Sequence, residues 1–459
     1  MKRIAIIGAG LSGTLLAINL LKQAVSKIPA SIFLIDRNPS NEMGPAYSSS
    51  EDCLLLNVPA CKMGAHDSDP EGFLKWARKK GIKAGEFDFL PRKLYKEYIH
   101  ELLEEAIQSK SNSTLFNRLQ GEVSDIDVAE GIARLHIGDS RIEADIVVLA
   151  LGNFPPRNLP LKNKSFLTCP NYYQNPWPDE AYKQIKPGQT VFIIGTGQTT
   201  IDILNRLFEK KHKGKIIAIS THGHLPNVHS DFQTYPSFFE EIKDLNSIAM
   251  ILRIFRRHIR RANEIGMDVN SVMDSLRPHT QQLWLHLSFN ERSRFLRHLF
   301  RYFEIVRSRI PPQSNHLVDK MLKSEQLRII RGRIQEIIVS TENTKIIFIP
   351  YKSNRAETID SDIVINCIGP EMNYEKIDQP FLQSLLKKGI IQTDPLNLGM
   401  NATIEGEIIN NQKSMHKIFY TLGSTMRGIL WEVLAVPEIR IQAELLSTKF
   451  LSDTSDENL

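Results

Sequence analysis

The sequence has few cysteines and no long apolar run, and both shortages limit the classes of protein that it can encode. Its four cysteines are Cys53, Cys61, Cys169 and Cys367. They show neither a Cys-x-x-Cys spacing nor a cluster with histidine, so the sequence predicts no disulfide framework and no metal site. No run of about 20 apolar residues is present, which argues against a membrane-spanning helix. We expect a cytoplasmic protein, because such cysteine usage fits a reducing compartment.

The excess of one sign of charge over the other is also small. The formal net charge is +5 over 459 residues, and the basic residues are not interleaved with aromatic residues. A nucleic-acid partner is therefore not expected, whereas a small positive balance suits anionic small molecules. The hydrophobic content of 42% and the charged content of 24% are those of an ordinary globular protein, and the length allows two to four domains.

What the sequence does contain is a dinucleotide-binding motif near residue 1. A short apolar stretch over residues 2–7 runs into a glycine-rich loop, and an apolar-periodic helix is expected to follow to about residue 21. The loop residues are Gly8, Ala9, Gly10, Leu11, Ser12 and Gly13. Their order is that of the Gly-x-Gly-x-x-Gly motif, which opens a βαβ unit and places phosphates at a helix N-terminus.

Each part of this motif has its own physical role. Gly8 makes the tight turn, Gly10 lets the backbone approach a pyrophosphate, and Gly13 lets the helix pack close to the strand. A second apolar strand over residues 30–36 ends at Asp36. A carboxylate at this spacing, about 20 residues after the loop, can accept hydrogen bonds from a ribose.

A second loop of the same kind follows the apolar strand over residues 191–194. Its residues are Gly195, Thr196, Gly197, Gln198, Thr199 and Thr200. Thr200 stands where the third glycine is usual, so this motif alone is weaker than the first.

An internal repeat strengthens the second motif. After each loop comes a series of alternating stretches typical of a β-meander, and then a buried strand that ends at glycine. The first series covers residues 121–126, 132–137 and 144–152, and the second covers 332–337, 345–349 and 361–369. We therefore expect an α/β fold with two Rossmann-like dinucleotide-binding domains of the three-layer ββα type, with Gly152 and Gly369 near the cofactors.

Several motifs outside the loops carry a resemblance to a known family. They lie at residues 44–47, 55–60, 91–95, 152–156, 276–278, 294–298, 394–399 and 431–440. On these residues the sequence resembles a bacterial family of FAD/NAD(P)-binding flavoproteins, related to the flavin-containing and N-hydroxylating monooxygenases. The resemblance covers nearly the whole chain. It implies that FAD binds the first unit and NAD(P)H the second.

The domain boundaries follow from this resemblance and from proline pairs in the sequence. We expect a discontinuous FAD-binding domain over residues 1–155 and 371–459, and an NAD(P)-binding domain over 156–235 and 316–370. Residues 236–315 lack strand alternation and are expected to form a helical insertion.

The resemblance also implies roles for individual residues. The first loop and Asp36 would hold the ADP part of FAD, with Arg37, Tyr47, Leu56 and Asn57 nearby, and the second loop would meet the nicotinamide dinucleotide. Gly423 ends the last strand, where many relatives continue with an aspartate that binds the ribityl chain. Ser424 follows here instead, which puts that contact in question.

The nicotinamide domain has no carboxylate after its second strand, where residues 220–224 are Ser-Thr-His-Gly-His. The usual acceptor for the ribose of NADH is therefore missing, which favours NADPH. Lys211, Lys213 and Lys215 would help to bind the additional phosphate only if their loop folds back.

The expected activity is hydride transfer from nicotinamide to flavin, which needs little acid or base from the protein. We expect an FAD-dependent NAD(P)H oxidoreductase, more specifically a monooxygenase-like enzyme acting on a small molecule. Asn57, Arg277 and Trp431 are candidates for lining its pocket, and structural roles are open for each. The alternatives are an NAD(P)H dehydrogenase or oxidase that passes electrons to a quinone, oxygen or a protein, and a non-enzymatic flavin redox sensor or scaffold.

Overall fold

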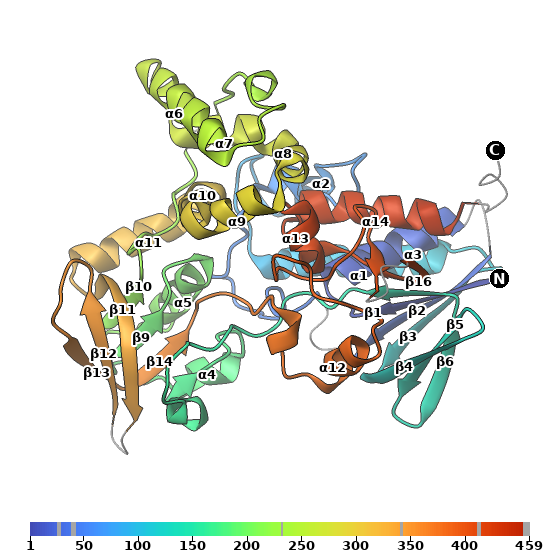
Figure 1. The fold of residues 1–459 in the computed structure, drawn as a ribbon, viewed down its shortest axis with the longest axis horizontal. Coiled ribbons are helices and arrows are strands. Elements are labelled where there is room, and N and C mark those ends of the chain that lie inside the picture. The colour runs from blue at the N-terminus through green and yellow to red at the C-terminus, as the bar shows by residue number, and fades with distance from the viewer. Residues whose placement is uncertain (25–28, 38–42, 231–232, 340–342, 411–414, 453–459) are drawn as a thin grey trace. The chain divides into compact units, whose positions relative to one another are not determined.

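The computed structural model describes residues 1–24, 29–37, 43–230, 233–339, 343–410 and 415–452. Two compact units share the chain. The first consists of Met1–Ser50, Val58–Phe154 and Met372–Leu459, and the second of Glu51–Asn57 and Pro155–Glu371. Figure 1 shows the elements of both units by label.

The first unit is built on a six-stranded sheet with the order β15-β16-β7-β1-β2-β3. Its strands are β1 (Lys2–Ile7), β2 (Ala30–Asp36), β3 (Leu115–Gln120), β7 (Ile146–Leu149), β15 (Glu407–Ile409) and β16 (Met415–Thr421). All neighbouring pairs are parallel except β15 with β16. The carboxyl ends of β1, β2 and β3 therefore meet at one edge, where ligands bind in open sheets of this type.

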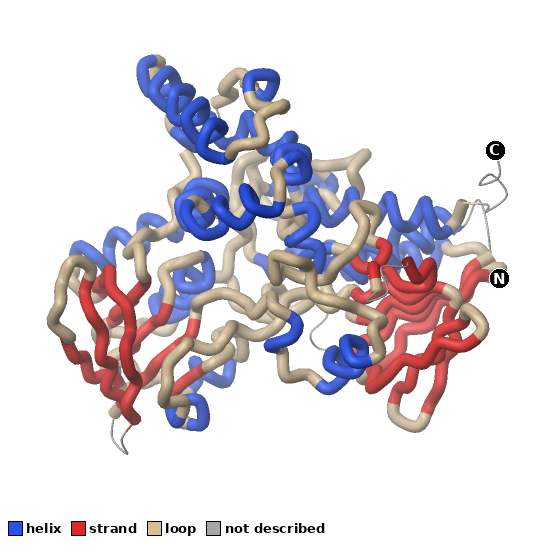
Figure 2. Tube along the Cα trace, viewed as in Figure 1, coloured by secondary structure: helices blue, strands red, loops and turns tan. Residues whose placement is uncertain are grey.

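Two further layers cover this sheet (Figure 2). One is an antiparallel meander of β4 (Val123–Ala129), β5 (Ile132–Ile137) and β6 (Ser140–Ala144). The helices of this unit are α1 (Leu11–Ala24), α2 (Gly72–Lys79), α3 (Arg92–Ser109), α12 (Pro380–Lys387), α13 (Arg427–Leu430) and α14 (Val436–Phe450). Of these, α12 packs against β4 of the meander. Helix α1 packs against α3 and α14.

The alternation of side chains along the strands explains the layers. Ala5 and Ile7 of β1 pack in one buried cluster with Leu135 of the meander and Leu382 of α12. Ile6 lies on the other face, next to α1. Both faces of the central strand are thus buried, as parallel sheets require, and each buried aliphatic side chain stabilises the fold by about 1.5–3 kcal/mol.

The second unit repeats this plan with a seven-stranded sheet of order β13-β12-β11-β10-β9-β14-β8. Its strands are β8 (Tyr172–Tyr173), β9 (Val191–Ile194), β10 (Ile216–Ser220), β11 (Leu327–Val339), β12 (Thr344–Pro350), β13 (Glu357–Ser361) and β14 (Ile363–Asn366). The long strand β11 pairs in parallel with β10 along its first part and antiparallel with β12 along its second. It therefore joins the nucleotide-binding sheet to the meander of this unit.

The segment between β10 and β11 is helical. The helices of this unit are α4 (Asp179–Lys183), α5 (Gln198–Glu209), α6 (Ile248–Glu264), α7 (Val269–Leu276), α8 (Thr280–His286), α9 (Phe289–His298), α10 (Phe300–Arg307) and α11 (Pro312–Lys323). Helix α11 packs beside α5, where the Asn205 side-chain amide donates a hydrogen bond to Ser314 Oγ at 3.0 Å.

These two units confirm the expected fold class, because each contains a parallel nucleotide-binding sheet, a meander and a helical layer. No helix in the described part of the chain is long and apolar enough to cross a membrane.

Candidate cofactor-binding sites

The first glycine loop joins β1 to α1, and two of its glycines are required by packing within the chain. Gly8 has a φ of +107°, and a Cβ there would lie 2.3 Å from the Ala150 carbonyl oxygen. A Cβ on Gly13 would lie 2.0 Å from the Gly8 carbonyl oxygen. The Gly8 amide donates to the Ile35 carbonyl at 2.8 Å, which fixes the turn between the ends of β1 and β2.

Gly10 differs from its neighbours in the loop. Among the described residues, no heavy atom lies within 4 Å of the position of a Cβ on Gly10. Packing among the described residues therefore does not explain this glycine, whereas the approach of a pyrophosphate to the backbone at the start of α1 would. The loop fits the dinucleotide that the sequence predicts.

The second loop reproduces these contacts in the other unit. Gly195 has a φ of +121°, its amide donates to the Ile219 carbonyl at 2.8 Å, and a Cβ would lie 2.4 Å from the Cys367 carbonyl oxygen. A Cβ on Gly197 has no described heavy atom within 4 Å. The open middle position thus occurs twice, once in each unit.

Thr200, the departure from the motif, has a structural explanation. Its side chain is fully buried, and its Oγ1 donates a hydrogen bond to the Gly195 carbonyl at 3.0 Å. Gly13, the equivalent residue in the first unit, leaves no room for any side chain at that place. Helix α5 therefore has space for a hydroxyl where α1 has none, and the hydroxyl satisfies the carbonyl of the turn.

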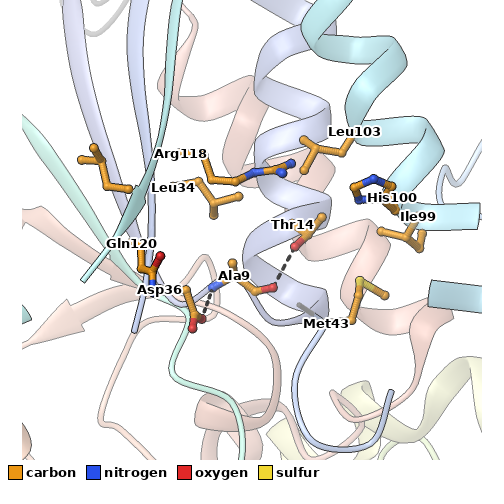
Figure 3. A pocket seen from close by; sticks show the side chains of 11 residues that line it. Ala9, Thr14, Leu34, Asp36, Met43, Ile99, His100, Leu103, Arg118 and Gln120 are labelled. Carbon is orange, nitrogen blue, oxygen red and sulfur yellow. Dashed lines mark hydrogen bonds between the residues drawn. The ribbon is translucent and has the colours of Figure 1, made fainter. Parts of the chain in front are cut away.

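A cavity of about 210 Å³ lies beside the first loop (Figure 3). Asp36 and Gln120, which pair in register at the ends of β2 and β3, both line it. Asp36 Oδ2 accepts a hydrogen bond from the Ala9 amide at 2.8 Å, and Thr14 Oγ1 donates to the Ala9 carbonyl at 3.0 Å. The acid of the motif is thus held at the edge of a cavity, next to the loop.

Sequence reasoning missed several residues of this cavity. They are Thr14, His100, Arg118 and Gln120. His100 and Arg118 come from α3 and β3, which pack against the first βαβ unit. None of these four residues belongs to a motif that the sequence analysis identified.

Arg37 and Tyr47 do not line this cavity. The Arg37 side chain is 66% exposed and forms an ion pair with Glu122 at 3.7 Å. The Tyr47 ring packs against Tyr95 with 5.6 Å between the ring centroids, and burial raises the pKa of Tyr47 to about 12. The Tyr47 hydroxyl is therefore neutral at physiological pH.

Gly423, at the end of the last strand, lies against the first loop. It has a φ of +77°, and a Cβ there would lie 2.4 Å from Ser12 Oγ. Its amide donates to Gln442 Oε1 of α14 at 2.7 Å. Gly152 and Gly369 also have positive φ, and the described chain leaves the space around a Cβ open at both.

The three candidate pocket residues do not form one cluster within either unit. Asn57 is exposed, and its carbonyl accepts a hydrogen bond from His229 Nε2 at 3.0 Å. Asn57, like Leu56, belongs to the second unit, as does Arg277, whereas Trp431 belongs to the first. Trp431 is only 4% exposed, and the Arg427 guanidinium lies 4.8 Å from its ring centroid.

The three lysines considered for a phosphate lie at the wrong end of β10. Lys213 donates its amide to the Pro187 carbonyl at 2.7 Å, and the Lys215 carbonyl accepts from Val191 at the start of β9. This is the amino edge of the parallel strands, opposite to the loop at Gly195. The loop does not fold back toward Gly195. The condition under which Lys211, Lys213 and Lys215 would bind the additional phosphate is therefore not met.

Together, two glycine loops on two parallel sheets, each with a meander and a helical layer, define the fold of the two-domain flavoprotein oxidoreductases. Residues 5–154 match the model of the FAD-NAD(P)-binding family. The first of the two loops thus lies in an FAD-NAD(P)-binding domain. A search of curated protein sequences finds no match.

Solved structures support the fold over the whole chain. The reduced form of ornithine hydroxylase from Pseudomonas aeruginosa is 14% identical, with a TM-score of 0.66 over 98% of this chain and 99% of that one. Ornithine N-hydroxylase from Kutzneria sp. is 12% identical, with a TM-score of 0.63 over 97% and 98%. Bacillithiol disulfide reductase from Staphylococcus aureus is 13% identical, with a TM-score of 0.58 over 98% and 99%.

Proposed function

We propose that this protein is an FAD-dependent NAD(P)H oxidoreductase, and that its reduced flavin serves a monooxygenase-like reaction on a small molecule. The observation that carries the proposal is the repeated loop with an open middle glycine, at Gly10 and at Gly197. Two such loops suit two dinucleotides, of which one can reduce the other.

The chain's own residues would bind and orient the two dinucleotides. In the first unit, Gly10 leaves open space at the start of α1, and Asp36 lies at the edge of the adjoining cavity. In the second unit, the loop from Gly195 to Thr200 opens α5 in the same way. FAD, when bound, would accept the hydride and activate oxygen, while the protein supplies position and electrostatics.

The monooxygenase-like reaction is supported by two of the structural neighbours, which are ornithine hydroxylases. The Kutzneria protein was solved with reduced FAD, NADP⁺ and L-ornithine. The disulfide reductase among the neighbours has the same fold, so the fold alone is compatible with both reactions. Asn57, Arg277 and Trp431 remain our candidates for lining the substrate pocket.

The test is a reductive and an oxidative half-reaction on the purified protein reconstituted with FAD. We expect a flavin spectrum and anaerobic bleaching by NADPH. On admission of oxygen with a primary-amine substrate such as ornithine, a hydroxylated product should form in proportion to the NADPH consumed. Stoichiometric hydrogen peroxide without hydroxylated product would indicate an oxidase. A flavin that neither NADPH nor NADH bleaches would contradict the proposal and favour the non-enzymatic redox sensor.

Two matched variants show whether the bleaching depends on FAD and NADPH bound at the two loops, and not on flavin free in solution. Gly10→Ala should lose FAD and all bleaching, whereas Gly197→Ala should keep the flavin spectrum and lose bleaching. Both positions have room for a methyl group among the residues that the structure describes, so both variants are expected to fold.

A further inference from the structure

Helix α6, at the top of Figure 1, has a strongly basic exposed face. Its exposed arginines are Arg253, Arg256, Arg257, Arg260 and Arg261. Residues three, four, seven or eight positions apart lie on the same side of an α-helix, so these side chains share one face. From Arg253 to Arg261 the helix rises by about 12 Å. The charges therefore form a row along α6 and are too far apart to share one phosphate group.

Most of this charge is not neutralised by the described part of the chain. Arg257 forms an ion pair with Glu241. The other four arginines of the row have no ion pair with an acid among the described residues. Glu264, the acidic residue of α6, is exposed at the end of the helix. One acid beside four unpaired arginines leaves the face with a clear positive charge.

The opposite side of α6 is fastened to the second unit. Its buried residues are Ile248, Ile251, His258 and Ala262. The His258 ring stacks on Phe238 with 3.9 Å between the ring centroids, and its Nδ1 lies 2.9 Å from the Tyr235 hydroxyl. Glu241 Oε1 lies 3.1 Å from His258 Nε2. These contacts fix the rotation of the helix, so the basic face is the side that a partner can reach.

Exposed apolar side chains accompany the arginines. Met250, one turn before Arg253 on the same face, is 50% exposed, and Ile265, directly after the helix, is 64% exposed. Phe255 of α6 is half-buried and packs toward Phe238, with 6.3 Å between the ring centroids. Single-stranded nucleic acids need exposed rings on which their bases stack. A lipid headgroup region instead offers phosphates for the arginines and hydrocarbon for the apolar side chains.

We propose that the basic face of α6 binds the surface of a membrane that contains anionic phospholipids. The planar guanidinium groups pair with lipid phosphates, and Met250 and Ile265 enter the boundary between headgroups and acyl chains. Each arginine near such a surface strengthens binding by about fivefold. Binding through four unpaired arginines is then reversible and sensitive to salt. The inference goes beyond the proposed function and does not depend on it.

The test is co-sedimentation of the purified full-length protein with lipid vesicles. We expect binding to vesicles of phosphatidylcholine mixed with phosphatidylglycerol, a decrease of this binding at high salt, and no binding to phosphatidylcholine alone. A triple variant with Arg253→Gln, Arg256→Gln and Arg260→Gln should bind the mixed vesicles about 100-fold more weakly, at about fivefold for each arginine. Equal binding to both kinds of vesicle, or no loss in the triple variant, would overturn the inference.

A charge-matched control removes three cations elsewhere in the second unit. Lys323→Gln, Arg328→Gln and Arg355→Gln change exposed residues outside α6, and this variant should bind the mixed vesicles as the native protein does. An equal loss in both triple variants would show that only net charge matters, which contradicts a role for α6. Circular dichroism and the urea midpoint check that both variants are folded.

A further variant separates lipid from other polyanions. Met250→Gln keeps every charge and should weaken binding to the mixed vesicles by about fivefold, because it removes an apolar contact. It should not change binding to polyglutamate or to a single-stranded oligonucleotide. Tighter binding of either polymer than of the mixed vesicles would overturn the lipid assignment. Bleaching of the flavin by NADPH should be the same in the native protein and in both triple variants, so the proposed function is tested separately.

Discussion

The hydroxyl of Thr200 donates a hydrogen bond to the carbonyl of Gly195, across the turn where the equivalent glycine of the first unit makes direct van der Waals contact. The usual third glycine permits close packing of helix and strand. In the second unit a small residue with a donor achieves a similar turn at slightly greater separation. The third position of the motif must therefore fit closely against the carbonyl of the turn. Gly13 does so by having no side chain, and Thr200 does so by donating a hydrogen bond to that carbonyl.

Removing this hydroxyl should destabilise the second unit. Thr200→Val keeps the shape of the side chain but leaves the buried Gly195 carbonyl without its donor, and we expect the free energy of unfolding to fall by about 1–2 kcal/mol. Urea unfolding measures the change. Thr358→Val, at an exposed position of β13, is the control, and an equal loss in both variants would refute the role of the hydrogen bond.

Two glycines of the first loop, Gly13 and Gly10, should respond differently to alanine. Gly13→Ala places a Cβ 2.0 Å from the Gly8 carbonyl oxygen, and we expect a loss of about 1–3 kcal/mol in unfolding free energy from this overpacking. Gly10→Ala should leave the unfolding of the FAD-free protein unchanged and abolish FAD binding. Fluorescence titration with FAD, beside Gly188→Ala as an open glycine outside the loop, tests this; normal FAD affinity in Gly10→Ala would contradict the assignment.

Two adjacent charged residues should differ in their effect on FAD. Asp36→Ala removes the carboxylate that accepts the Ala9 amide at the cavity edge, and we expect FAD affinity to fall by about tenfold or more. Arg37→Ala removes only an exposed side chain paired with Glu122, and it should bind FAD normally. Equilibrium dialysis compares the two, and a larger loss in Arg37→Ala would restore the expectation from the resemblance.

His66 should make the protein less stable in mild acid. Its pKa is lowered from 6.5 to about 4, first by burial and then by the charge of Lys22, whose Nζ lies 2.7 Å from His66 Nε2; Asp69 opposes the shift and Arg440 adds to it. Since the unfolded chain binds the proton first, this contribution is full above pH 6.5 and is lost as the pH falls toward 4. We expect a loss of about 1–2 kcal/mol by pH 5.

The measurement is urea unfolding at pH 7 and pH 5. His66→Gln should reduce the pH dependence by that amount, and Lys22→Met should reduce it partly, because one positive neighbour is gone. A pH dependence that is the same in His66→Gln and in the native protein would show that other groups cause it.

The fold could be predicted from the sequence because its signals are local. Residues 2–13 contain a strand, a turn and a helix start in consecutive positions, and residues 191–202 do so again. Burial on both faces then gives the strands continuous apolar runs, which periodicity detects. The second meander was found in the same way, although its first strand is also the last parallel strand of the sheet.

The sites were less accessible to sequence reasoning, because they depend on neighbours in space. Gln120 comes beside Asp36 only after the whole segment between β2 and β3, so spacing in the sequence could not connect the two residues. The three lysines near β10 misled for the opposite reason: they are close in sequence but lie at the other edge of the sheet. Likewise, Leu56 and Asn57 follow the first βαβ unit along the chain yet belong to the second unit.

The division of the chain has a consequence for synthesis on the ribosome. Strand β16, which pairs with β7 in the first unit, and helix α14, which packs on α1, are translated after residue 371, whereas the last strand of the second unit ends at Asn366. Every strand of the second unit therefore leaves the ribosome before the first unit has all the strands of its sheet. A nascent chain stalled between these points would carry one finished nucleotide domain and one still open beside β7.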